Sequence, residues 1–259
     1  VGNRLGQVFE VPESGPPRLV ASLGEAISSL AVSPDGARIA VGLGTFMGSQ
    51  NRAIVLIDSI SGKVIRNHEG HAGSPVSIAF SPDGKTLGTL TQIDLQKLMT
   101  GSAGALAGQE ELRLWSVETG QLLSTAINER NALGTPFIRA QLKFSRDGQS
   151  LAVAAWDEAV RLYALPFSSA ELKSKRVLEG RGAPALQVAL DEQGKSLAIS
   201  AGRPRNKKAA EYYEAAQLIQ DFGGESNFTR EQLARLSVLY GPKGFRKHRQ
   251  TVSIWDLTD

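Results

Sequence analysis

Short segments of alternating apolar and polar residues, separated by polar turns, recur along the whole chain. Four of the turns follow one pattern, in which a serine or aspartate begins and a glycine ends a tight reversal. Aspartate bonds back to its own main chain and glycine accepts the left-handed conformation, so each turn predicts a β-hairpin. The four turns are Ser33-Pro34-Asp35-Gly36, Ser81-Pro82-Asp83-Gly84, Ser145-Arg146-Asp147-Gly148 and Asp191-Glu192-Gln193-Gly194.

Each hairpin is followed by a third segment that alternates in the same way. Its five copies align as Val8 to Val11, Leu56 to Ser59, Leu114 to Val117, Leu162 to Leu165 and Ile254 to Leu257. Ser61-Gly62 and Thr119-Gly120 then predict tight turns into a fourth, outer strand. A unit of four short antiparallel strands cannot bury its own apolar face, so it requires stacked neighbours. The pattern predicts an all-β chain of four-stranded blades, which is the β-propeller architecture.

The clearest copy runs from Gly70 to Ser116. It opens on Gly70-His71, contains one of the Asp-Gly turns and closes on Leu114-Trp115. In this order of parts the chain resembles the WD40-repeat family over nearly all of its length outside the insertions, with degenerate repeats of bacterial appearance. The resemblance implies a β-propeller that serves as an interaction scaffold.

The resemblance also implies a buried set of structural residues. In the family this set joins the histidine of the Gly-His pair, a hydroxyl on the second strand, an aspartate in the following turn and a tryptophan. His71, Thr89 and Trp115 match three of these in one repeat, where an insertion replaces the aspartate turn. Asp157 matches the turn aspartate of another repeat, and Trp255 stands at the tryptophan position of the last. No repeat has the full set, so we expect the blades to depend mainly on apolar packing.

The repeats are too few for a large ring. The chain starts within a third strand and ends within another, and four units show both inner strands. We therefore predict about four to five blades within one propeller segment, residues 1–259, cut as an arc from a longer propeller. Closure through pairing of the terminal strands is the alternative.

Three repeats are lengthened at the same connection, between the second and third strands. The insertions run from Gly44 to Arg52, from Gln92 to Glu110 and from Arg203 to Gln250. Because these connections are equivalent, we expect all three on one face of the propeller. Loops on a rigid scaffold often carry binding residues, so this face is the predicted working surface.

The longest insertion, residues 203–250, is predicted to contain two helices. Residues 208–222 show helical apolar spacing before Gly223-Gly224, and Thr229 with Gln232 forms a capping box before a helix that ends at Gly241-Pro242. Two interpretations are open: the apolar stripes pack on each other or on the blade below, or they dock a partner.

Both ends of this insertion are basic, and they should lie close together because they join adjacent strands. Such a patch can bind an acidic protein face, nucleic-acid phosphate or an anionic lipid surface. The alternative is a solvated run of charges. The partner-binding candidates are Arg203, Arg205, Lys207, Lys208, Lys243, Arg246, Lys247 and Arg249.

The composition mainly excludes certain kinds of chemistry. The chain has no cysteine, which excludes disulfides and thiolate chemistry, and its net charge of +3 is too small to identify a partner. His68 and His71 are wrongly spaced for a helical zinc site, and His248 is distant in sequence. We predict no catalytic residue, no cofactor and no metal ligand.

The sequence therefore predicts a non-catalytic protein-interaction scaffold, or an accessory subunit of a larger complex, that binds through the insertion face. One alternative is an enzyme or ligand-binding propeller with its site at the central channel. Another is a protein that binds nucleic acid or an anionic surface through the basic insertion. The chain shows neither a long apolar run nor a charged leader, and it starts at Val1. We expect a cytoplasmic protein, with a periplasmic or partner-mediated membrane location as the alternative.

Overall fold

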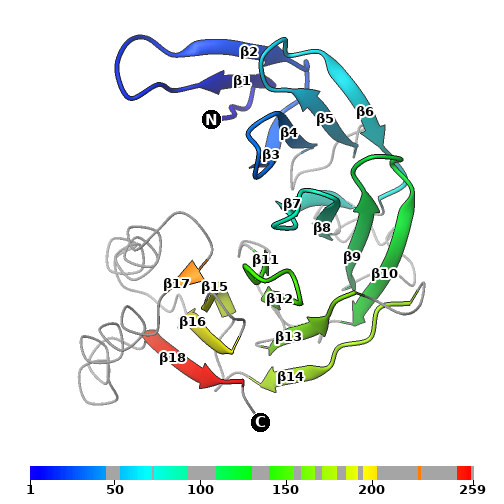
Figure 1. Cartoon of the computed structure of the whole chain (residues 1–259), viewed down its shortest axis with the longest axis vertical. Coiled ribbons are helices and arrows are strands. Elements are labelled where there is room, and N and C mark those ends of the chain that lie inside the picture. Colours follow the sequence, from blue (N-terminus) through cyan, green and yellow to red (C-terminus); the bar gives the residue numbers. More distant parts are fainter. Residues whose placement is uncertain are drawn as a thin grey trace, which may run out of the picture. The chain divides into compact units, whose positions relative to one another are not determined.

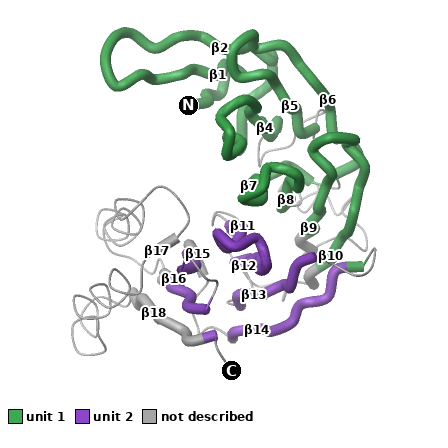
Figure 2. Tube along the Cα trace, in the orientation of Figure 1, with its two compact units in different colours: residues 1–136, 169–171 green, residues 137–168, 172–259 purple. Residues whose placement is uncertain are grey.

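The computed structural model describes residues 1–44, 53–71, 73–92, 109–129, 140–154, 159–166, 171–179, 185–191, 195–202, 227–228 and 250–257. Within these ranges all regular structure is β-strand (Figure 1). The chain divides into two compact units, one of residues 1–136 and 169–171 and the other of residues 137–168 and 172–259 (Figure 2). No helix long and apolar enough to cross a membrane occurs in the described ranges.

The first unit contains a hairpin and two four-stranded antiparallel sheets. The hairpin pairs β1 with β2, and the sheets have the orders β3-β4-β5-β6 and β7-β8-β9-β10. Sequence order and sheet order are therefore the same, as in a blade. The strands are β1 Gln7–Glu10, β2 Arg18–Ser22, β3 Ile27–Val32, β4 Arg38–Leu43, β5 Ile54–Asp58, β6 Val64–His68, β7 Ser74–Phe80, β8 Thr86–Gln92, β9 Gln109–Ser116 and β10 Leu122–Glu129.

The second unit contains two more four-stranded sheets. One has the order β11-β12-β13-β14, and the other has the order β17-β15-β16-β18. The predicted first, second and third strands of all four repeats are thus present, and the predicted all-β fold of four-stranded blades is confirmed. The strands are β11 Gln141–Phe144, β12 Ser150–Ala154, β13 Ala159–Ala164, β14 Arg176–Glu179, β15 Ala185–Asp191, β16 Ser196–Gly202, β17 Asn227–Phe228 and β18 Gln250–Asp256.

The hairpin turns repeat one hydrogen-bond pattern. In the turn that begins at Ser145, the serine Oγ donates to Asp147 Oδ1 at 2.6 Å and accepts from the backbone N–H of Ser150 at 2.9 Å. The turns that begin at Ser33 and Ser81 have the same bonds. In the turn that begins at Ser81, the serine hydroxyl lowers the pKa of Asp83, and the backbone N–H of Lys85 adds to the effect.

Apolar side chains on both faces of each central strand build the core. In β4, Ile39 and Val41 face the β1–β2 hairpin, while Ala40 faces the sheet β7 to β10. Strand β5 alternates in the same way. This period of two, with both faces buried, is what a stacked sheet requires. In the second unit one cluster likewise joins β12 to β14 with β15 and β16.

Strand β17 bears on the expectation that the longest insertion lies with the other two on one face of the propeller. The insertion leaves β16 at Gly202 and rejoins β18 at Gln250, which are paired at one end of the sheet. Within it, Asn227 pairs with Leu190 and Phe228 with Asp191, in parallel, at the opposite end of β15. The insertion therefore does not stay at the end of the sheet where it emerges. Residues 227–228 lie along the outer edge of the first strand, an edge that no described strand occupies in the other three four-stranded sheets.

Several predicted features lie outside the described residues. These are both helices of the 203–250 insertion, the 45–52 segment and most of the 93–110 segment. The short connection around Asp157 also lies there, although β12 and β13 are paired up to Ala154 and Val160, on either side of it.

Candidate functional site

The eight basic candidates of the longest insertion lie outside the described residues, as does Asp157. They are Arg203, Arg205, Lys207, Lys208, Lys243, Arg246, Lys247 and Arg249. The backbone of Trp255 lies in β18, opposite Leu197 of β16. Of the predicted structural residues, the structure therefore defines the side-chain surroundings of His71, Thr89 and Trp115. No group of three or more histidine, aspartate or glutamate side chains in the described part of the chain could hold a metal ion.

Trp115 is the centre of a buried polar cluster in the first unit. Its side chain is 5% exposed and lies between the sheets β3 to β6 and β7 to β10. The indole Nε1–H donates to Thr89 Oγ1 at 3.0 Å, and this hydroxyl donates to the backbone carbonyl of Arg113 at 3.3 Å. The bonds join the second and third strands of one sheet and hold the indole in a single orientation.

Two histidines contact the same indole. The rings of His68 and His71 each lie 5.3 Å from the Trp115 ring, edge-on at 71° and 68°. Burial lowers the pKa of His71 to about 3, and the charges of Arg113 and His68 add to this effect. Burial also lowers the pKa of His68, although the backbone carbonyl of Ile54 opposes the shift. Both imidazoles are therefore neutral at pH 7.

Arg113 and Glu111 complete this cluster, and the sequence analysis did not single out either. The Arg113 guanidinium carbon lies 5.6 Å from the centre of the Trp115 ring, within cation–π range. Arg113 Nη2 forms an ion pair with Glu111 Oε1 at 2.7 Å. The sequence did contain one indication that they lie beside Trp115: side chains alternate along a strand, so residues 111, 113 and 115 of β9 share one face of the sheet.

We expect the free energy of unfolding to fall with pH below 6.5 because of His71. Between its ordinary pKa of 6.5 and its folded pKa of about 3, the unfolded chain binds a proton that the folded chain does not. Stability therefore decreases as pH falls, by about 1.4 kcal/mol per pH unit, or about 2 kcal/mol between pH 7 and 5. Urea titrations in carboxylate-free buffer measure this slope. A His71→Asn variant should lose most of it, and an equal slope in both proteins would contradict the assignment.

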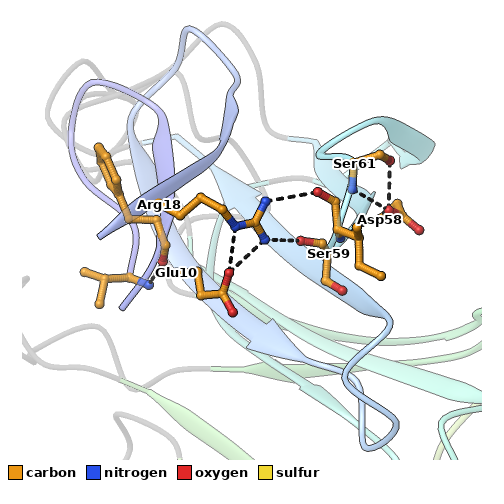
Figure 3. A network of polar contacts seen from close by, with 8 residues as sticks. Glu10, Arg18, Asp58, Ser59 and Ser61 are labelled. Atoms are coloured by element: carbon orange, nitrogen blue, oxygen red, sulfur yellow. Dashed lines mark hydrogen bonds and ion pairs between the residues drawn. The ribbon is translucent and has the colours of Figure 1, made fainter. Parts of the chain in front are cut away.

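The hairpin β1–β2 is joined to the next sheet by Arg18 (Figure 3). Its guanidinium pairs with Glu10 at 2.8 Å and donates to the backbone carbonyls of Ser59 and Ile60 at 3.2 and 3.1 Å. In the accepting turn, the backbone N–H and the hydroxyl of Ser61 lower the pKa of Asp58, which caps this turn. Arg18 thus connects an outer strand to the turn between the third and fourth strands of its neighbour.

The next joint in the same unit has the same form. Arg66 of the outer strand β6 donates to the backbone carbonyl of Glu118 at 3.0 Å. Glu118 precedes Gly120 by two residues, as Ile60 precedes Gly62. Both glycines have left-handed backbones, with φ of 68° and 75°, and a Cβ on either would overlap the preceding sheet, at the Val20 carbonyl oxygen and at Arg66 Cδ respectively. The Ser-Gly and Thr-Gly turns are therefore contact points between sheets.

The fold and the contacts between neighbouring sheets define the class of protein. It is a protein built of consecutive four-stranded blades of the β-propeller type. A solved structure titled "Kuenenia stuttgartiensis Hydrazine Synthase" shares this fold, with a TM-score of 0.50 and 16% sequence identity over 70% of this chain and 43% of that one. At this identity the likeness concerns the fold alone.

The sequence comparisons identify the repeat. Residues 62–104 match the family described as "WD domain, G-beta repeat", so the chain carries a WD40 repeat, as its residues predicted. A relative, "Transcription initiation factor TFIID subunit 5" of Caenorhabditis elegans, is 28% identical over 118 residues. These residues are 46% of this chain and 15% of the relative, so the chain spans a small part of that protein.

Proposed function

We propose that this chain is a non-catalytic scaffold or accessory subunit that binds a protein partner through the end of its blades where the insertions emerge. One observation carries the proposal. In each sheet the hairpin turn lies at one end of the second strand, while the long connections after Leu43, Gln92 and Gly202 start from the other end. The paired strands thus form a rigid support for long connecting segments. Residues that bind a partner often lie on loops that a rigid scaffold supports in this way.

The comparisons support a protein partner within an assembly. The chain carries a WD40 repeat, and the curated relative is named as a subunit of a transcription initiation factor. We propose that the basic residues at both ends of the 203–250 insertion make the decisive contacts, since they are the densest group of charges in the chain. A location in the cytoplasm is part of the proposal.

Reversal of four of these charges tests the proposal. A variant with Arg205, Lys207, Arg246 and Lys247 changed to glutamate should lose the proteins that co-purify with the tagged wild-type chain at physiological salt. Its melting temperature should change little, because exposed charges contribute little to stability. Quantitative mass spectrometry of the purified complexes measures the loss.

The matched control reverses four exposed basic residues elsewhere: Arg4, Lys63, Lys85 and Lys173. This variant should keep the same co-purifying proteins. Equal retention by both variants would reject the basic patch. Co-purified material that disappears on nuclease treatment would instead support nucleic-acid binding, and turnover of a small molecule by the purified chain would contradict a non-catalytic role.

A further inference from the structure

We infer that the side-chain amine of Lys143 is a nucleophilic site that takes a small aldehyde as an imine. Lys143 lies in β11, on the face that packs against the next sheet of the second unit. The inference is independent of the basic insertion and goes beyond the proposed scaffold function. It rests on the position of Lys143 in the repeat, on its apolar surroundings and on the charges near it.

Lys143 occupies a position that the other three repeats fill with alanine. The residues two places before the four hairpin turns are Ala31, Ala79, Lys143 and Ala189. In each sheet this residue pairs with a small residue of the second strand, and these partners are Ala40, Gly88, Ala152 and Ala198. The blade therefore does not require a lysine at this position, and a role other than packing is open to it.

The space beside Lys143 is apolar. Its partner Ala152 is fully buried and belongs to the cluster that joins β12 to β14 with β15 and β16. Gln141 shares the face of Lys143, because side chains alternate along a strand. Gln141 Oε1 accepts from the backbone N–H of Val188 in β15 at 2.8 Å, so β11 and β15 lie side by side (Figure 1). Lys143 keeps part of its surface exposed, which leaves a path for a small reagent.

The carboxylates described nearby are directed elsewhere. Asp147 and Asp191 each cap their own hairpin turn, where Asp191 Oδ1 accepts from the backbone N–H of Lys195 at 2.7 Å. Glu179 alternates with Leu178, which faces the apolar cluster, so Glu179 lies on the opposite face of the sheet. None of these three carboxylates is therefore placed to pair with Lys143.

The basic side chains near Lys143 do not favour its ammonium form either. Arg161 lies between Val160 and Leu162, which both face the cluster, so Arg161 lies on the opposite face. Arg176 pairs with Leu162 and shares the face of Lys143, but it is in the outer strand β14 and has the same sign of charge. The described side chains thus offer Lys143 no opposite charge on its own face.

Burial without an opposite charge favours the neutral amine. It lowers the pKa of Lys143 below its ordinary value of 10.5. The neutral amine has a lone pair that can attack a carbonyl carbon, whereas the ammonium has none. Lys143 therefore has more of the nucleophilic form at neutral pH than a lysine in water.

The reaction with an aldehyde needs no further reactant. Lys143 Nζ adds to the carbonyl carbon and forms a carbinolamine. The aldehyde oxygen then leaves as water with the two protons of the amine, and a carbon–nitrogen double bond remains. No atom is oxidised or reduced overall, and water reverses the step. A short, apolar aldehyde fits best, because the neighbouring cluster is apolar.

The test treats the wild-type chain with propanal and sodium cyanoborohydride at pH 7, which converts the imine into a stable propyl-lysine. Mass spectrometry of chymotryptic peptides measures the rate at Lys143 and at three exposed reference lysines, Lys63, Lys85 and Lys173. Lys143 should be modified faster than each reference, by about threefold or more. The excess should vanish in concentrated urea, and Lys143→Ala confirms which peptide carries the label.

Competitive acetylation separates the protonation of the amine from access to it. A trace of acetic anhydride labels the same four lysines between pH 7 and pH 10. The ratio of the Lys143 rate to each reference rate should fall as pH increases, because an amine with a lowered pKa becomes neutral at lower pH. Access to Lys143 affects its rate equally at every pH, so it does not change this trend.

Faster propanal modification of Lys143, together with a ratio that falls with pH, supports the inference. Modification of Lys143 no faster than that of the references overturns it, whatever the ratio does. A ratio that stays constant with pH also overturns it, since Lys143 would then be a lysine whose stem is buried and whose ammonium reaches water.

Discussion

Replacement of Trp115 by alanine should lower the free energy of unfolding by about 3 to 5 kcal/mol, the range for a buried tryptophan. The indole fills space between two sheets and is contacted by two imidazoles and one guanidinium, so its removal leaves a cavity and exposes polar groups together. Chemical denaturation at pH 7 measures the loss.

Two further variants separate the causes. Trp115→Phe keeps an aromatic ring but loses the hydrogen bond to Thr89, and should cost less than the alanine variant. Ile60→Ala removes a large side chain that is 80% exposed and should change stability by less than about 0.5 kcal/mol. If Trp115→Ala were as stable as Ile60→Ala but failed to bind a partner, Trp115 would be a contact residue.

The second large effect is expected at Gly62. An alanine here is strained by the left-handed backbone and also overlaps the Val20 carbonyl of the neighbouring hairpin. We expect a loss of about 2 to 5 kcal/mol in the free energy of unfolding, the sum of left-handed strain and overpacking.

Gly36 provides the control for Gly62, because it has nearly the same backbone angle, φ of 71°, with no atom within 4 Å of a Cβ at that position. Gly36→Ala should therefore show the strain alone, about 1 to 2 kcal/mol. The excess in Gly62→Ala measures the contact between the β1–β2 hairpin and the turn after β5. Equal losses in the two variants would show that this contact does not hold in solution.

The strands could be predicted from the sequence because their causes are local. Turns such as Ser81 to Gly84 fix the hairpins, and the period of two fixes which residues are buried. The start of β7 at Ser74, earlier than its apolar residues indicate, could not be predicted, because it depends on pairing with β8. The same holds for β17, whose pairing with β15 joins residues that are more than 30 positions apart.

The site was predicted only in part. His71, Thr89 and Trp115 were singled out together and lie together, while their structural role stays a prediction. Arg113 and Glu111 were missed because an arginine and a glutamate on an alternating strand are usually solvent-facing, and only the neighbouring histidines show that this pair is partly buried. The basic ends of the long insertion remain a prediction.

The joint formed by Arg18 with the turn after β5, and again by Arg66 with the turn after β9, has an evolutionary consequence. The sheet β3 to β6 thus carries both halves of the arrangement: Arg66 is a donor for the sheet that follows, and the turn after β5 is an acceptor for the hairpin that precedes. Duplication of this repeat would therefore supply the donor and the acceptor of the new joint together. An insertion between the second and third strands starts at the opposite end of the sheet from this turn, so it can grow while both joints stay intact.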